Sequence, residues 1–184
     1  MNLESIGPGM QDGDLVICRG RSPISWFIRS WTQSPFAHVG VIVFDTRADL
    51  GHVPHVIEAR LGRLVTCRPL EQVIHEDGKC DWYKLTCPDV DRVKVAAAAR
   101  QFLGMPYASY FQFLRSFSVA TSWLLDRFGY PDDTDAGRVF CSELVMEALR
   151  VGGMEWSYDQ EPARMTPGDV ALLPCFQRKG TVTL

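Results

Sequence analysis

The sequence has no surplus of basic charge. Its 19 lysines and arginines are outnumbered by 22 aspartates and glutamates, so the formal net charge is −3. The basic residues are scattered along the chain and do not gather in one segment. Proteins that neutralise nucleic-acid phosphates usually carry a concentrated basic surface. We therefore expect no nucleic-acid partner.

The chain also lacks a secretory signal and a membrane-spanning run. Residues 1–9 contain neither a positive start nor an apolar core, which a signal peptide needs. The most apolar stretch, at 108–130, is interrupted by Arg115, and its unbroken apolar run is shorter than the ~20 residues that a span requires. We therefore expect a cytoplasmic protein without a transmembrane segment.

The spacing of the cysteines matches no metal site or disulfide framework. The cysteines are Cys18, Cys67, Cys80, Cys87, Cys141 and Cys175. They form no Cys-x-x-Cys pair and no combination with the four histidines that suits zinc. His52 and His55 could be half of a metal site, but their Gly- and Pro-containing context favours a solvated loop. We expect no metal, no cofactor and, without secretion, no disulfide scaffold.

No internal repeat or low-complexity linker divides the 184 residues. A chain of this length ordinarily forms one domain with its own core, and we expect a single domain over 1–184. We expect this domain to contain an aromatic-rich helical insertion at about 108–136. It could be a lid or an acyl-chain groove over a site, or an extra helix packed on the core. The sequence gives no indication of the oligomeric state.

Local patterns place most of the regular elements. We expect strands at 14–18 and 83–85, a helix after Ser22, and a helix at 89–103. The first of these helices would carry four apolar residues on one face, namely Ile24, Phe27, Ile28 and Trp31. The block at 165–173 repeats the Gly-Asp-Val/Leu pattern of the first strand, so we expect it to return as a strand or edge segment near the sheet.

Cys141 lies at the start of an amphipathic helix. The apolar residues that follow it recur at spacings of three to four: Leu144, Val145, Ala148, Leu149 and Val151. Unpaired N–H groups and the helix dipole favour an anion at a helix start, so they lower the pKa of a thiol there. Cys141 could therefore be a nucleophile, although a free cysteine is more often a small buried hydrophobe.

A histidine and a glutamate on two apolar segments could serve this thiol. His38 opens a β-branched run at 38–44, which predicts a buried strand. Glu58 lies on an alternating strand at 55–59, and a hairpin of the two strands would place Glu58 beside His38. Thiol catalysis needs a nucleophile, a base and a polar group that orients the base. Cys141, His38 and Glu58 fit these roles in that order; otherwise His38 is a satisfied strand-end histidine and Glu58 a solvent-facing carboxylate.

These segments resemble the NlpC-like branch of the papain-like fold in its circularly permuted form, which includes YiiX-like proteins and relatives of lecithin:retinol acyltransferase. In the unpermuted family a Gly-x-Pro-Tyr segment and a Cys-Ser helix precede the Gly-Asp-Leu, His-Val-Gly and third strands. The same blocks occur here in rotated order: Gly13-Asp14-Leu15-Val16, His38-Val39-Gly40, Val56-Ile57-Glu58-Ala59, Gly104-Met105-Pro106-Tyr107 and Cys141-Ser142-Glu143-Leu144-Val145. This rotation is the specific part of the resemblance.

The resemblance implies an α+β, papain-like fold in which an antiparallel sheet carrying His38 and Glu58 packs against the helix of Cys141. It implies that Cys141 is the nucleophile, His38 the general base and Glu58 the third member. Tyr107 matches the family's tyrosine near the reacting carbonyl and could donate to the oxyanion. The backbone N–H of Cys141 or Ser142 is the other candidate donor. The family's aspartate after this tyrosine is an alanine here.

Three functions follow as alternatives. The NlpC resemblance implies a cysteine hydrolase that cleaves an amide bond, in a cell-wall-type peptide or a related amide, through an acyl-enzyme. The permuted relatives and the apolar insertion point instead to a lipid-directed thiol acyltransferase or esterase. The third alternative is a non-catalytic module that binds a lipid or peptide on the same fold.

Overall fold

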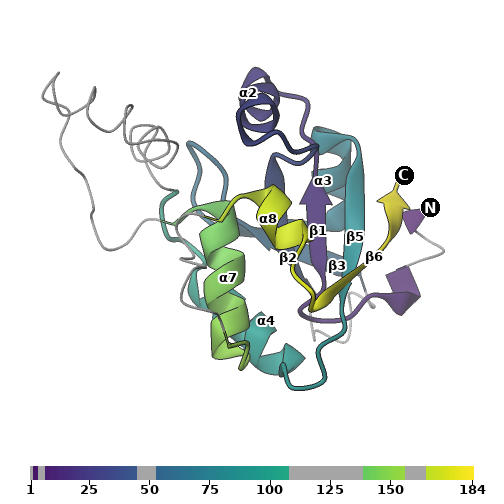
Figure 1. Ribbon diagram of the computed structural model, residues 1–184, viewed down its shortest axis with the longest axis vertical. Coiled ribbons are helices and arrows are strands. Elements are labelled where there is room, and N and C mark those ends of the chain that lie inside the picture. The colour runs from purple at the N-terminus through teal and green to yellow at the C-terminus, as the bar shows by residue number, and fades with distance from the viewer. Residues whose placement is uncertain (1, 4–6, 45–52, 108–138, 156–164) are drawn as a thin grey trace, which may run out of the picture.

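The computed structural model describes residues 2–3, 7–44, 53–107, 139–155 and 165–184. Within these residues, six strands form one sheet in the order β4-β3-β2-β1-β5-β6, and every neighbouring pair is antiparallel (Figure 1). The strands are β1 (Leu15–Cys18), β2 (His38–Phe44), β3 (Pro54–Glu58), β4 (Thr66–Pro69), β5 (Cys80–Leu85) and β6 (Phe176–Val182).

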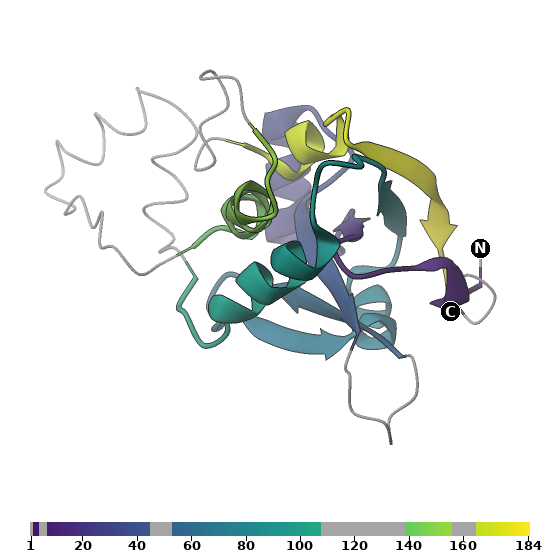
Figure 2. The same cartoon turned by 90° about the horizontal axis from the view of Figure 1, so that it is seen from below.

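Helices cover both faces of the sheet. The helices are α2 (Pro23–Thr32), α3 (Leu70–Asp77), α4 (Arg92–Gln101), α7 (Cys141–Val151) and α8 (Pro167–Ala171), with a short 3-10 turn η1 (Gly7–Gly9). Helices α4 and α7 lie side by side on one face, as Figure 2 shows, and α3 packs on the opposite face. None of the described helices is long and apolar enough to cross a membrane.

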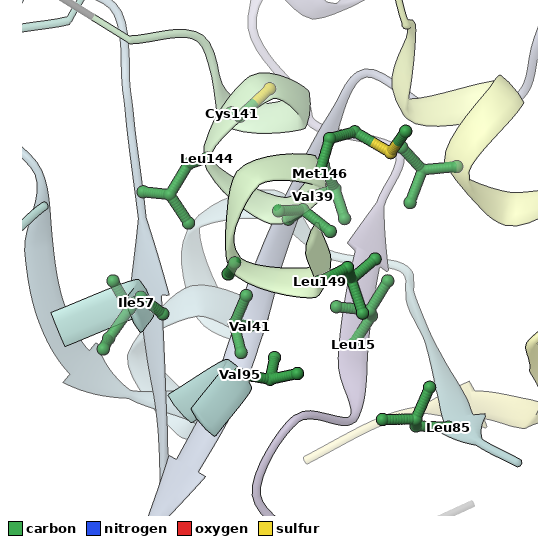
Figure 3. Packing of buried hydrophobic residues seen from close by; sticks show 14 of the residues in the cluster. Leu15, Val39, Val41, Ile57, Leu85, Val95, Cys141, Leu144, Met146 and Leu149 are labelled. Carbon is green, nitrogen blue, oxygen red and sulfur yellow. The ribbon is translucent and has the colours of Figure 1, made fainter. Parts of the chain in front are cut away.

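The central strands are apolar on both sides because each face is covered. In β1, Leu15 and Ile17 belong to the core beneath α4 and α7, whereas Val16 and Cys18 belong to the core beneath α3. Successive strand residues point to opposite faces, so a strand between two layers has a continuous apolar sequence. Figure 3 shows the larger core, in which Leu149 of α7 lies over the sheet.

The helix expected after Ser22 forms, and Ser22 is its N-cap: its side chain accepts a hydrogen bond from the Ser25 N–H at 3.1 Å. The helix expected at 89–103 is shorter. It begins at Arg92 because Asp91 is its N-cap: the Asp91 carboxylate accepts hydrogen bonds from the N–H groups of Val93 and Lys94. The predicted insertion at about 108–136, Arg115 and His52 lie outside the described residues.

The expectation of a strand at 165–173 was wrong, because this block contains helix α8. Thr166 accepts a hydrogen bond from the Asp169 N–H, and the Asp169 carboxylate accepts from the Thr166 N–H, so the two residues form a reciprocal capping box. Pro167 occupies the first turn, where its missing N–H has no cost. The strand that follows this block is β6, which pairs with β5 and forms one of the two edges of the sheet.

One disulfide is present, contrary to what the sequence indicated. Cys18 of β1 and Cys80 of β5 occupy directly opposite positions in the sheet and are bonded to each other. The two cysteines are 62 residues apart in the chain. Their pairing depends on the register of two distant strands, which the spacing of cysteines does not reveal.

Gly40 provides a test of the packing between β2 and β3. A Cβ at this position would lie 2.4 Å from Cγ1 of Val56 and 3.3 Å from Cβ of Glu58. We expect Gly40→Ala to lower the free energy of unfolding by about 1–3 kcal/mol, the usual cost of overpacking. Urea denaturation measures this change. Gly9→Ala is the control, because its Cβ would make an ordinary 3.4 Å contact with Trp82, and equal stability of the two variants would contradict the prediction.

Candidate active site

The start of helix α7 holds the Cys141 thiol in a nearly closed environment. Cys141 is the first residue of the helix and is 6% exposed. Phe140, the residue before it, is extended, and its N–H donates to the Glu143 carboxylate at 3.1 Å. The backbone N–H groups of Ser142 and Val39 donate to the Cys141 sulfur. The helix therefore presents N–H donors to the thiol, as its position in the sequence predicted.

The pKa of the Cys141 thiol lies below its usual value. Burial raises this pKa, but the hydrogen bond and positive charge of His38, followed by the N–H groups of Val39 and Ser142, outweigh the effect of burial. A lowered pKa increases the thiolate fraction, and the thiolate is the reactive form of cysteine.

His38 and Glu58 lie together, as the hairpin expected from the sequence requires. Strands β2 and β3 are antiparallel neighbours, and His38 Nε2 lies 2.6 Å from Glu58 Oε2. Both residues are buried, with His38 8% and Glu58 0% exposed. Because Nε2 faces Glu58, Nδ1 is the ring nitrogen that is left for the hydrogen bond with Cys141.

The surroundings of His38 favour its protonated form. Burial and the positive charge of Arg60 lower the pKa of His38, whereas the hydrogen bonds to Cys141 and Glu58 and the charge of Glu58 raise it. The net result is a pKa of about 9. The raised His38 pKa and the lowered Cys141 pKa both favour a thiolate and imidazolium pair.

Two arginines hold the other oxygen of Glu58. Glu58 Oε1 accepts from Arg60 Nε at 2.9 Å and from Arg68 Nε at 2.8 Å. Arg60 in turn donates to both carboxylate oxygens of Asp77. Burial raises the pKa of Glu58, but hydrogen bonds and charges of His38 and Arg60 hold it far below its usual range. Glu58 is therefore ionised, with Oε2 fixed toward His38. No local pattern in the sequence predicted this arginine pair.

Tyr107 reaches the same thiol from a different segment. Its backbone forms a parallel bridge with Val139, and its ring lies edge-on to Phe140 with centroids 5.8 Å apart. The Tyr107 hydroxyl makes a hydrogen bond with Cys141. Burial and the nearby Cys141 raise the pKa of Tyr107 well above its usual value, so the hydroxyl keeps its proton. The structure thus brings together all five residues expected from the sequence, and it adds the unexpected Val39 N–H.

Two clusters of potential metal ligands occur in the described part of the chain, His38–Glu58–Asp77 and Cys18–Asp77–Cys80. The first is already satisfied, because Glu58 accepts from His38 and two arginines and both Asp77 oxygens accept from Arg60. In the second, the two sulfurs are joined in a disulfide. Neither donor set fits a metal ion in this arrangement.

A family model described as "Permuted papain-like amidase enzyme, YaeF/YiiX, C92 family" matches residues 9–170. The chain belongs to this family. The C92 assignment makes it a cysteine amidase-type hydrolase with a circularly permuted papain-like fold, as the rotated order of motifs implied. No curated protein matches the chain.

A solved structure agrees with the C92 fold. The crystal structure of the metalloprotein YiiX from Escherichia coli O157:H7 is similar with a TM-score of 0.63 and 23% sequence identity. The match covers 91% of this chain and 95% of that chain. At this identity the likeness establishes the α+β architecture alone, and the description as a metalloprotein applies to YiiX.

The imidazole partner of Cys141 can be tested without a substrate. A free cysteine has a pKa of about 8.5. We expect Cys141 to react with iodoacetamide well below that pH, because His38 lowers the Cys141 pKa. In His38→Ala the rate at neutral pH should fall at least about tenfold, since the thiolate loses its cation. Peptide-resolved mass spectrometry measures the rate against pH. His75→Ala is the control, and an unchanged pH profile in His38→Ala would refute the pairing.

The charge of Glu58 should control the titration of His38. Glu58→Gln removes an anion that raises the His38 pKa, so we expect the pKa to fall from about 9 by about one unit or more. A histidine whose pKa is raised on folding contributes its whole stabilisation of the folded protein below its unfolded-state pKa of about 6.5. That contribution is lost as the pH rises through the folded-state pKa. In Glu58→Gln this loss should begin at lower pH.

Proton NMR titration of the imidazole measures this pKa directly. Glu76→Gln is a matched control because Glu76 also binds Arg68, with 2.7 Å between Arg68 Nη1 and Glu76 Oε1, but it does not contact His38. An identical His38 titration in Glu58→Gln and wild type would show that Glu58 does not stabilise the cation.

Proposed function

We propose that the protein hydrolyses an amide bond with Cys141 as nucleophile, His38 as acid and base, and Glu58 as the group that orients His38. The observation that carries the proposal is the continuous hydrogen-bonded series Cys141–His38–Glu58 at the start of α7. The order of the three residues and the lowered pKa of Cys141 suit a thiol that must be ionised near neutral pH to act as a nucleophile.

The first chemical step uses the thiolate and imidazolium pair. The Cys141 sulfur attacks the carbonyl carbon, a C–S bond forms, and the carbonyl electron pair moves to oxygen. His38 then transfers its proton to the leaving nitrogen as the C–N bond breaks, which releases an amine and leaves a thioester. Water attacks the thioester while His38 accepts a water proton. Collapse of that intermediate releases the acid and restores the Cys141 thiolate and the protonated His38.

The same donors that stabilise the thiolate can serve the oxyanion. In the free enzyme the Tyr107 hydroxyl and the Ser142 N–H bind the Cys141 sulfur. When the C–S bond forms, the sulfur loses its negative charge, and these donors can then bind the negatively charged oxygen of the intermediate. The raised pKa of Tyr107 keeps its hydroxyl a donor throughout.

We propose a peptide amide of the cell-wall type, or a related amide, as the substrate. A lipid amide or ester is the second candidate, because helix α2 exposes Trp26 and Ile24 in the segment that leads into His38. Acyl transfer to an acceptor other than water would use the same thioester.

Trapping the acyl-enzyme tests this function. Wild type would be incubated with muropeptide-type amides, long-chain acyl amides and long-chain acyl esters, then quenched in acid for intact-mass and peptide analysis. We expect one class to add the mass of its acyl group to Cys141. Cys141→Ala should give no adduct, and His38→Ala should slow acylation by about 10²–10⁴-fold, the usual effect of a general acid–base group.

Cys175→Ala is the control for thiol specificity. Cys175 is also buried, but burial, together with nearby Cys87, raises the pKa of its thiol to about 12, so its loss should leave acylation unchanged. Absence of an adduct with all three substrate classes, or an adduct on another cysteine, would refute the proposed chemistry.

A further inference from the structure

Arg19, the residue after β1, carries a hydrogen-bond donor that the fold does not use. The residue is half-buried. Among the described residues, its Nε is the one buried side-chain nitrogen or oxygen that has no hydrogen-bond partner. Buried polar groups in folded proteins are almost always hydrogen-bonded, so each exception requires an explanation. A ligand that accepts from this guanidinium would provide one.

The register of the sheet places Arg19 on the same face as the Cys141 thiol. The Val39 N–H donates to the Cys141 sulfur, and Val39 is paired with Ile17 of β1. Both residues of this pair belong to the core beneath α7. Residues two apart on a strand share a face, so Arg19 follows Ile17 on the α7 side of the sheet. Figure 3 shows Cys141 at the end of α7 toward which β1 runs.

The contacts of Arg19 with the chain of β5 agree with this placement. The Arg19 N–H donates to the Lys79 carbonyl oxygen at 3.0 Å, which continues the pairing of β1 with β5 by one residue. Asp81 lies opposite Ile17 and therefore also faces the α7 side. Burial raises the pKa of Asp81, and the positive charge of Arg19 is one of the effects that lower it. The guanidinium of Arg19 thus lies on the α7 side as well.

A substrate bound at Cys141 would extend within reach of Arg19. Neighbouring strands lie about 4.8 Å apart, and residues two apart on a strand lie about 6.7 Å apart, so the Arg19 backbone is about 8 Å from that of Val39. An extended peptide covers this distance with about two residues. A group on the substrate that is about two residues from the scissile bond therefore falls beside Arg19.

The nearby carboxylate of Asp81 is already bound by other groups. Its Oδ2 accepts from Arg178 Nε at 2.8 Å, and its Oδ1 accepts from the Thr181 hydroxyl at 2.6 Å. Two arginines thus lie near one carboxylate, which leaves one positive charge in excess among these three residues. Guanidinium groups bind carboxylates through paired N–H donors, so this excess charge suits an anionic ligand.

We propose that Arg19 binds a carboxylate of the substrate, so that the enzyme prefers peptide amides with a free carboxylate about two residues from the scissile bond. The Nε–H and one terminal N–H of the guanidinium would each donate to one carboxylate oxygen. The preference between substrates rests on the proposed function, whereas the binding of a carboxylate at Arg19 is measurable without any turnover.

NMR of the arginine Nε–H groups tests this binding in Cys141→Ala. The probes are a muropeptide-type peptide with free carboxylates, the same peptide with its carboxylates converted to carboxamides, and inorganic phosphate. We expect only the peptide with free carboxylates to shift the Arg19 Nε–H resonance, which the additional change Arg19→Gln assigns by removing it. Absence of a shift, or an equal shift with the carboxamide peptide or with phosphate, would overturn the proposal.

Acylation rates test the preference between the two peptides. In wild type we expect kcat/KM for acylation of Cys141 to be at least about tenfold higher with the free carboxylates, the usual effect of a hydrogen bond to a charged group. The difference should lie mainly in KM, because the contact is made before the reaction begins. Arg19→Gln should remove the difference. Thermal unfolding and the alkylation of Cys141 by iodoacetamide would verify that the fold and the thiol of this variant are intact.

Arg21→Gln is the matched control because it removes the same charge two residues away. Arg21 is exposed, and its Nη1 donates to the His75 carbonyl oxygen of α3 at 3.4 Å. Helix α3 covers the face of the sheet opposite to α7, so Arg21→Gln should keep the preference for free carboxylates. An equal loss of preference in Arg19→Gln and Arg21→Gln would indicate a general attraction of anions and would also overturn the proposal.

The two measurements separate this inference from the proposed function. Equal acylation of Cys141 by both peptides would leave the proposed chemistry standing and remove the role of Arg19. A shift of the Arg19 resonance by the free carboxylates, without any acyl-enzyme in wild type, would leave the carboxylate site standing and remove the proposed chemistry.

Discussion

The organisation of the active-site end depends on one buried carboxylate, that of Glu58. A charge with no exposed surface requires charged or hydrogen-bonding partners, since its desolvation would otherwise force it to neutralise. One oxygen of Glu58 binds His38 and the other binds Arg60 and Arg68. The arginines keep the carboxylate ionised and fixed in orientation, and the carboxylate then favours the protonated imidazole.

The lowered pKa of the Cys141 thiol follows from this arrangement. Burial alone would raise the pKa of the Cys141 thiol, as it does for Cys175. The difference between the two cysteines is the positive imidazole and the N–H donors at the start of α7, and these exist because α7 packs on β2 in the larger core. Apolar packing therefore places the thiol, and a series of charges extending from Arg60 through Glu58 and His38 sets its protonation.

The sequence predicted the parts that local patterns determine. A few neighbouring residues are enough to indicate the helix start at Cys141, the strand start at His38 and the alternating strand that contains Glu58. The rotated order of the motifs predicted the permuted papain-like fold. The strand prediction at 165–173 was wrong because the Gly-Asp-Val pattern of this segment resembles the start of β1. The capping box of Thr166 and Asp169 instead starts a helix there. The arginine pair and the Cys18–Cys80 bond could not be predicted, because both depend on strand register across long separations.

The Cys18–Cys80 disulfide separates the residues of the candidate site into two groups, one inside the loop of chain that the bond closes and one outside it. It closes a ring of chain that contains His38, Glu58 and both arginines. Cys141 and Tyr107 lie outside this ring, on a tail that begins after Cys80. Such a bond acts mainly by restricting the unfolded chain, so His38, Glu58 and the two arginines stay within one closed loop of chain even when the sheet is unfolded. Cys141 has no such tether and joins them through non-covalent contacts, chiefly the packing of α7 on β2.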